Sequence, residues 1–149
     1  MPKYYFVFFL ILVSGTVFET YAQTKGSVKQ PAESNVRATP AYAVVLVRKT
    51  DLQAEMESLL VEYTEDYPKV RDLRLELEVL KPEIDRVLAV KPADAGNLSE
   101  ALGKLILSKV AHATALKKLQ MQFQDAHPNV KKEKRMVEIY EAAIREILP

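Results

Sequence analysis

The chain has 149 residues, 48% of them hydrophobic and 28% charged, which is the composition of an ordinary globular or helical domain. Its 21 basic and 20 acidic side chains nearly balance, so no bulk charge favours nucleic acid as a partner. The sequence has no cysteine, which excludes disulfides, thiol catalysis and thiolate metal sites.

Residues 1–22 have the pattern of a secretory signal peptide. Lys3 gives a positive start, an apolar run extends from Tyr4 to Val13, and small residues precede a cleavage point after Ala22. A retained membrane anchor is the alternative, but the run falls short of the roughly 20 apolar residues needed to span a membrane. We therefore expect a cleaved chain without a stable membrane span, located in a bacterial periplasm or secreted.

Residues 23–39 contain polar residues, glycine and proline with hardly any large apolar side chain. Such a stretch buries too little apolar surface to offset the entropy lost on ordering. We expect a flexible linker here, so the folded part should begin near residue 40.

The rest of the chain contains one unit twice, at an offset of 60 residues. The segment that starts at Ala41 aligns without a gap on the segment that starts at Ala101. Apolar positions agree almost throughout, and within each copy they recur at alternating steps of three and four. This spacing is typical of the narrow apolar stripe of an α-helix in a coiled coil or bundle.

We predict an all-α fold of two tandem helical hairpins, whose four helices pack as a bundle or as an elongated antiparallel coiled coil. Residues 40–91 should form the first hairpin, residues 92–97 a linker and residues 98–149 the second hairpin. Helices of about 25 residues would be about 37 Å long. One apolar stripe buries too little surface alone, so the hairpins should pack on each other or on another chain.

Charge favours one way of packing the helices. Residues 40–66 carry two basic and six acidic side chains, whereas residues 97–127 carry four basic and two acidic ones. Opposite net charge should favour contact between the first and third helices within one chain, although each exposed ion pair contributes little.

Local chemistry suggests where the helices begin. Thr39 and Pro40 offer an N-cap followed by proline at the first helical position, and Asn97 with Glu100 gives a capping box for the third helix. A further capping pattern at Thr50 leaves open a shorter first helix preceded by a strand. The equivalent part of the second copy has a helical pattern, so we expect the longer helix.

Two residue pairs should reverse the chain. Tyr67 and His127 precede Pro68 and Pro128, and a residue before proline is pushed out of the helical region. Each pair should interrupt its helix and fold the flanking segments antiparallel, a kinked continuous helix being the alternative. His127, aligned with Tyr67, should fill space or cap its turn. Pro82 falls on the outer face of the second helix and should bend or end it without disturbing the stripe.

Polar residues on the stripe are the remaining candidates. Lys49 and Lys109 occupy equivalent positions, where a polar group either sets register and oligomeric state or extends its ammonium to water. In the second copy His112 and Glu133 also break the stripe, and we interpret His112 as a tolerated polar core residue. Acidic side chains along the helices, Glu83 among them, should be solvated.

The sequence contains no constellation of residues for catalysis, for a metal or for a cofactor. With two histidines and no cysteine, it has no HExxH motif, no glycine-rich phosphate loop and no nucleophile elbow. We therefore expect a protein that is not an enzyme and that has no catalytic site, metal site or cofactor.

The two predicted turns carry similar strings. One is YTEDYPKVRDL, from Tyr63 to Leu73, and the other is FQDAHPNV, from Phe123 to Val130. This pattern resembles the periplasmic coiled-coil part of bacterial polysaccharide chain-length determinant proteins, in which an aromatic residue, a few polar residues, His-Pro and valine lead into a leucine-periodic helix. The resemblance covers the turns and their flanking helices only, because the family's two membrane spans and α/β domain have no counterpart here.

The leading functional expectation is an exported, non-enzymatic helical interaction protein of the bacterial cell envelope. Its partner would be itself, as a possible homo-oligomer, or an envelope protein, and no nucleic acid is expected. The family resemblance implies an alternative, an accessory factor in polysaccharide export or chain-length control. A second alternative is a periplasmic holdase chaperone, against which the near-neutral charge argues, because such a protein usually wants a basic cavity.

Overall fold

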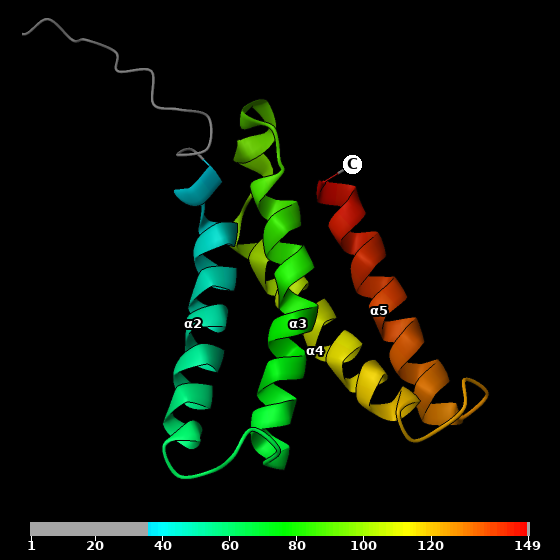
Figure 1. Cartoon of the computed structure of the whole chain (residues 1–149). Helices are drawn as coiled ribbons and strands as arrows, with labels where there is room; N and C mark the ends of the chain where they lie inside the picture. The colour runs from blue at the N-terminus through cyan, green and yellow to red at the C-terminus, as the bar shows by residue number, and fades with distance from the viewer. Residues whose placement is uncertain (1–35, 149) are drawn as a thin grey trace, which may run out of the picture.

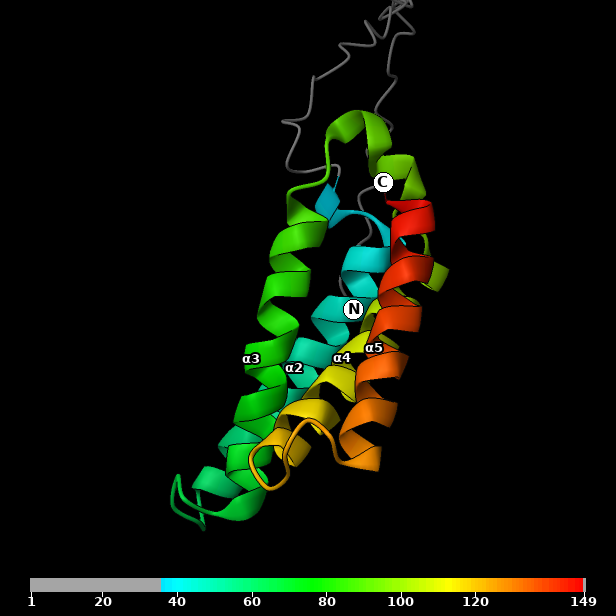
Figure 2. The ribbon, with the colours of Figure 1, turned by 90° about the vertical axis from the view of Figure 1, so that its right-hand side faces the viewer.

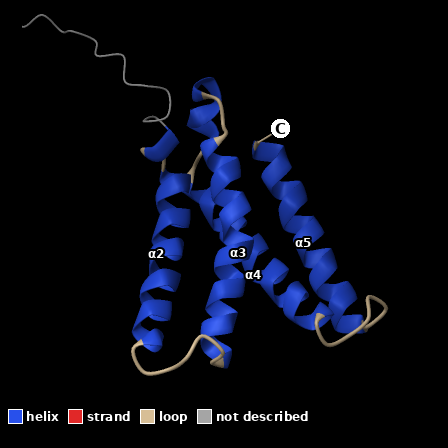
Figure 3. Ribbon diagram, in the orientation of Figure 1, coloured by secondary structure: helices blue, strands red, loops and turns tan. Residues whose placement is uncertain are grey.

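The computed structural model describes residues 36–148, and every element in this part of the chain is helical (Figure 3). The elements in chain order are α2 (Pro40–Leu60), α3 (Pro68–Leu88), the 3₁₀ helix η1 (Pro92–Asn97), α4 (Glu100–Gln120) and α5 (Pro128–Ile147). No strand occurs in the described residues, which confirms the all-α prediction and excludes a strand before Thr50. The predicted signal peptide and residues 23–35 of the predicted linker lie outside this part.

The duplication in the sequence is also a duplication in the structure. α2 and α4 begin and end 60 residues apart, and α3 and α5 begin at the equivalent prolines. The helices have 20 or 21 residues and are therefore about 30 Å long, shorter than expected. They end early because residues 61–67 and 121–127 form the turns that reverse the chain. The prediction of a break before each proline is confirmed.

Short hydroxyl side chains set the starts of α2 and α4. Thr39 caps α2 and Ser99 caps α4, each by accepting a hydrogen bond from the amide three residues ahead, at 3.4 and 3.3 Å. The predicted capping box is wrong, because Asn97 is the last residue of η1 and Leu98 follows it as a buried connection. The true cap of α4 is the repeat equivalent of the cap of α2.

The two hairpins share α4 as their meeting point. α2 packs on α3, α4 packs on α5, and α4 also packs against both helices of the first hairpin. Figure 1 shows α2 and α5 at opposite sides of the molecule, with the two turns at the same end. The view in Figure 2, turned by 90°, places the turns at that same lower end.

One continuous core joins the hairpins, with buried residues from all four α-helices. Its fully or almost fully buried members are Val36, Ala41, Tyr42, Val45, Leu52, Leu73, Leu80, Val87, Leu98, Leu102, Ile106, Val110 and Ile144. The Ala41 amide donates a 3.1 Å hydrogen bond to the Leu98 carbonyl and so ties the starts of the two hairpins together. Val36 and Thr39 are buried, so the folded part begins a few residues before the predicted end of the linker.

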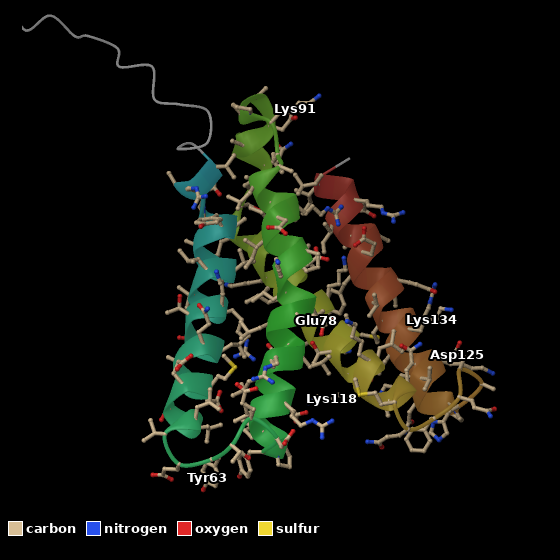
Figure 4. All side chains as sticks on the ribbon, in the orientation of Figure 1. Tyr63, Glu78, Lys91, Lys118, Asp125 and Lys134 are labelled. Carbon is tan, nitrogen blue, oxygen red and sulfur yellow. The ribbon has the colours of Figure 1, made fainter. Side chains whose placement is uncertain are left out.

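Two further expectations are met in part. Pro82 lies on the exposed face of α3, as expected, but the helix continues through it, so Pro82 does not end α3. The expected contact between α2 and α4 within one chain is present, but no ion pair joins these two helices among residues 36–148. Instead Lys117 and Lys118 of α4 bind Glu78 and Asp72 of α3, at 2.9 and 2.8 Å, in the region marked by the Glu78 and Lys118 labels of Figure 4.

Candidate functional site

The two turns share one geometry. Tyr63 stacks on Tyr67 in the first turn and Phe123 stacks on His127 in the second, each with 4.2 Å between ring centroids. In both turns the amide of the first ring residue donates a 2.8 Å hydrogen bond to the carbonyl four residues earlier. His127 also accepts a 3.2 Å hydrogen bond from the Asn129 amide at the start of α5. Stacked rings and backbone hydrogen bonds therefore fix the conformation of each turn.

Each turn also exposes two large apolar side chains at equivalent positions. We call them the tip residues: Val61 and Tyr63 (85% and 43% exposed), with Met121 and Phe123 (70% and 41% exposed). Figure 4 shows Tyr63 at one turn and Asp125 at the other, both far from Lys91 at the opposite end. Isolated exposed apolar residues are common, but a repeated set at one end of a molecule is the kind of surface that contacts a partner.

A groove of about 490 Å³ lies between the start of α3 and the end of α4, next to the tip residue Met121. Pro68, Leu75 and Met121 contribute apolar lining. The charged lining is of both signs: Arg71, Arg74 and Lys118 with Asp72 and Glu78. The groove therefore connects the two hairpins at the end where their tips lie.

A network of charged side chains lies between α3, α4 and α5. The Lys109 ammonium is 2.6 Å from Glu83 Oε1 and 2.5 Å from Glu141 Oε2. Arg86 of α3 and Arg145 of α5 also bind Glu141, at 3.1 and 3.0 Å. We call these five residues the Lys109 network. The side chains of Lys109 and Glu83 are only 15% and 11% exposed, so their ion pair is largely removed from water.

Glu83 contradicts the expectation that acidic residues along the helices are solvated. It is buried on the side of α3 that faces α4, and its second carboxylate oxygen has no hydrogen-bond partner among the described residues. Lys109 is the one cation that binds it in this part of the chain. The polar position of Lys109 on the stripe was visible in the sequence, but the partners Glu83 and Glu141 were not. A cation on an apolar stripe is stabilised either by an anion nearby or by reaching water, and the first possibility could have prompted a search for these partners.

The pKa of Glu141 reflects its place in the network. Burial raises this pKa. Hydrogen bonds from Lys109 and Arg145, together with the positive charges of Lys109 and Arg86, outweigh burial and lower the pKa from 4.5 to about 2. A carboxylate whose folded-state pKa is depressed stabilises the fold above its ordinary pKa of 4.5, and this contribution disappears as the pH falls toward 2.

The Glu141→Gln variant should therefore differ most from the parent protein at neutral pH. We expect it to lower the free energy of unfolding at pH 7 by up to about 3 kcal/mol. The loss should be smaller than this limit because water partly screens the site. Urea unfolding followed by circular dichroism at pH 7 and pH 3 tests this. The difference between the two proteins should shrink in acid, and an equal difference at both pH values would contradict the assignment.

The second hairpin contains a polar layer that the first hairpin lacks. His112 Nδ1 lies 2.6 Å from Glu133 Oε2, and the His112 ring stacks on Tyr140 with 5.4 Å between ring centroids. The repeat equivalents of His112 and Glu133 are Leu52 and Leu73, which are both buried in the core. The two sequence positions that broke the stripe are thus partners of each other.

Restoring leucine at both positions should stabilise the protein. A partly buried His–Glu pair loses hydration that an apolar pair does not, so we expect His112→Leu with Glu133→Leu to raise the free energy of unfolding by about 1 to 3 kcal/mol. Thermal and urea unfolding at neutral pH measure the change. The single variant Glu133→Leu leaves His112 without its partner and should be less stable than the double variant. Equal or lower stability of the double variant would argue that the polar pair itself holds the hairpin together.

Lys49, the repeat equivalent of Lys109, has a different environment. It is half-buried at a groove of about 420 Å³ between α2 and α3, which Leu77, Leu80 and Ile84 also line. No carboxylate forms an ion pair with Lys49 within the described part of the chain, unlike Lys109. A role in register and extension of the ammonium to water both remain predictions for Lys49.

Within residues 36–148 no group of three or more histidine, aspartate or glutamate side chains is placed to hold a metal ion. None of the helices in that part of the chain is long and apolar enough to cross a membrane.

Comparisons with known proteins add no relative: no protein-family model, no curated protein and no solved structure matches this chain. The geometry of the turns and of the helix faces is therefore the basis for a functional interpretation.

Proposed function

We propose that this chain is a non-enzymatic helical interaction protein, exported to a bacterial cell envelope, which binds a partner protein through the tips of its two hairpins. The observation that carries the proposal is the matched set of exposed tip residues at one end of the molecule. In this proposal the four helices form a bundle of two tandem hairpins that holds the tips in place.

Three features support an apolar segment of the partner as the bound group. The tips are prepared for binding, because stacked rings and backbone hydrogen bonds hold each turn in one shape. They are apolar and exposed, so contact with an apolar segment would remove them from water. The groove that Met121 lines adds the apolar surface of Pro68 and Leu75 beside the second tip.

A variant with an acidic residue at each tip tests the proposal. Val61→Asp with Met121→Asp changes two highly exposed side chains, so the helical circular dichroism spectrum should be unchanged. A photo-crosslinking residue at Val61 or Met121, introduced one at a time, should capture the same envelope protein in cells. The purified partner should then bind the parent chain and lose at least tenfold in affinity for the double variant, in keeping with two apolar contacts of central importance.

Ala93 supplies the matched control, since it is exposed in η1 at the end opposite the tips. A crosslinker at Ala93 should not capture that partner, and Ala93→Asp should leave its affinity unchanged. The proposal fails if the tip variant binds the partner as well as the parent chain does, or if the two tip positions capture nothing in common.

The exposed tips also favour a second function, that of a holdase for unfolded envelope proteins. Two apolar tips on a rigid support could hold extended apolar segments of many clients. The parent chain should then suppress aggregation of a chemically denatured client, measured by light scattering, and Val61→Asp with Met121→Asp should lose that effect. Absence of suppression by the parent chain at molar excess would dismiss the holdase function.

An accessory role in polysaccharide export is a further proposal, motivated by the turn strings that resemble chain-length determinants. Deletion of the gene should then alter the length distribution of surface polysaccharide on a denaturing gel. A normal distribution in the deletion strain would count against this role and would leave the tip-binding proposal intact.

A further inference from the structure

A groove with an apolar floor lies between α2 and α3, which pack side by side (Figure 1). Its volume is about 420 Å³, and its lining extends from position 42 to 53 on α2 and from position 77 to 88 on α3. Eleven residue steps on each helix make the groove about 16 Å long. The apolar lining consists of Tyr42, Leu77, Leu80, Ile84 and Leu88. We call this feature the α2–α3 groove.

The groove also has a net positive charge. Its charged lining consists of three cations and one acid: Arg37, Lys49 and Lys81 with Asp85. Within residues 36–148 none of these four residues forms an ion pair, and the Arg37 guanidinium donates a 3.2 Å hydrogen bond to the Tyr42 hydroxyl. Asp85 can offset one positive charge at most, so two remain beside the apolar floor.

The second hairpin shows how a carboxylate binds at the equivalent position. Lys49 and Lys81 correspond to Lys109 and Glu141, which lie 60 residues later. In the second hairpin the Lys109 ammonium binds Glu141 at 2.5 Å and also Glu83 of α3 at 2.6 Å. In the first hairpin both positions are cations. An anion that binds Lys49 as Glu141 binds Lys109 would therefore come from outside the described residues.

The dimensions of the groove fit an extended chain better than a helix. A volume of about 420 Å³ spread over about 16 Å gives a mean cross-section of about 25 Å². An α-helix with its side chains is about 10 Å wide and needs roughly three times that area. An extended peptide is narrower, but it would press backbone N–H and C=O groups against apolar side chains that cannot hydrogen-bond them. The floor therefore suits a hydrocarbon chain, which has no such groups.

We propose that the α2–α3 groove binds a medium-chain fatty acid. The carboxylate binds Lys49 and Lys81, and the hydrocarbon tail leaves water by lying along Ile84 and Leu88 toward Tyr42. Because α2 and α3 are antiparallel, Tyr42 and Leu88 lie at the same end of the groove (Figure 1). The seven residue steps from Lys49 to Tyr42 span about 10 Å, which is the length of about eight extended carbons.

A carboxylate is favoured over other anionic head groups because both anions that bind Lys109 in the second hairpin are carboxylates. Ligand sites are typically apolar cavities of roughly 300–1,000 Å³ in which a few polar groups set the orientation, and the α2–α3 groove matches that description. The groove contains no tip residue. Fatty-acid binding therefore goes beyond the proposed function and does not depend on it.

Calorimetric titration of the full chain with decanoate, kept below its micelle concentration, tests the proposal. Saturable binding of one decanoate per chain is expected. Octanoate should bind about tenfold more weakly, because two fewer CH₂ groups leave water. Acetate has the head group without the tail, and decyltrimethylammonium has the tail with the opposite charge. Neither should bind measurably.

Lys49→Gln with Lys81→Gln should weaken decanoate binding at least tenfold, because both cations that bind the carboxylate are lost. Lys49→Arg with Lys81→Arg keeps both charges and should bind within about threefold of the parent chain. Arg37→Gln, a control that removes the cation away from the carboxylate, should also stay within about threefold. Val61→Asp with Met121→Asp, the tip variant, should bind decanoate as the parent does. Circular dichroism should show equal helix content in all variants, and Lys81→Gln alone, at an exposed position, replaces the double glutamine variant if that one loses helix.

The proposal is overturned if decanoate does not bind saturably, which is also the result expected if a partner helix, a second copy or the residues before Val36 occupied the groove. It is overturned if the double glutamine variant binds as tightly as the parent. A greater loss for Arg37→Gln than for the lysine variant would overturn it too, because the carboxylate would then lie elsewhere. Tighter binding of decyl phosphate than of decanoate would assign the groove to a phosphate head group and overturn the choice of a carboxylate.

Discussion

Replacing Lys109 with leucine should lower the free energy of unfolding by about 3 to 5 kcal/mol, because it removes one partner from two largely buried ion pairs. Glu83 would lose the one described cation that binds it, and Glu141 would keep only its two arginines. Urea unfolding at neutral pH, followed by circular dichroism, measures the loss. The variant is apolar and similar in size, so the effect reports on the abandoned carboxylates rather than on lost volume.

Lys49→Leu is the matched control at the equivalent position of the first hairpin. Lys49 has no carboxylate partner among the described residues and lies beside apolar side chains of α3, so its replacement should change stability by less than about 1 kcal/mol or increase it. The same variant, measured by light scattering, tests the proposed role of Lys49 in oligomeric state, and an unchanged mass would refute that role. Equal losses for Lys49→Leu and Lys109→Leu would show that the Lys109 network is not the cause.

Replacing Gly103 with alanine should lower the free energy of unfolding by about 1 to 3 kcal/mol, although alanine favours a helix more than glycine does by about 1 kcal/mol. The added Cβ would lie 2.9 Å from the Cβ of Val44 and 3.1 Å from the carbonyl oxygen of Ala41, so α2 and α4 must move apart. Thermal unfolding gives the change, and Gly103→Val should cost more than Gly103→Ala.

Gly96→Ala provides the comparison, because nothing lies within 4 Å of a Cβ added at Gly96. It should leave stability within about 1 kcal/mol of the parent value. A stabilising Gly103→Ala would mean that the two hairpins do not approach each other as closely as described.

The helices and turns could be predicted because they depend on local patterns. Apolar residues at alternating steps of three and four predicted the position of every α-helix described, and Pro68 and Pro128 predicted both turns. The helix ends were missed by several residues because the stacking of Tyr63 on Tyr67, and of its counterpart pair, draws the aromatic residue out of the helix and into the turn. The cap at Ser99 was missed because Asn97 and Glu100 also fit a capping pattern, and only the position of η1 decides between them.

The polar interior was half visible in the sequence. Lys109, His112 and Glu133 stood out because each interrupts an apolar stripe, and all three form polar contacts inside the second hairpin. Their distant partners, such as Glu83, lie outside the apolar stripe of their own helix, and residues outside the stripe are expected to face solvent. Which of those faces becomes an interface depends on how α4 crosses the first hairpin, and a one-helix pattern holds no information about that crossing.

The hydrogen bond between Ala41 and Leu98 gives the molecule a direction. It fastens the beginnings of both hairpins at one pole, where Val36 enters the core, and the chain reverses at the other pole. At 1.5 Å per residue the 21 residues of α2 separate the poles by about 30 Å. A partner bound near Val36 would therefore lie about 30 Å from both turns.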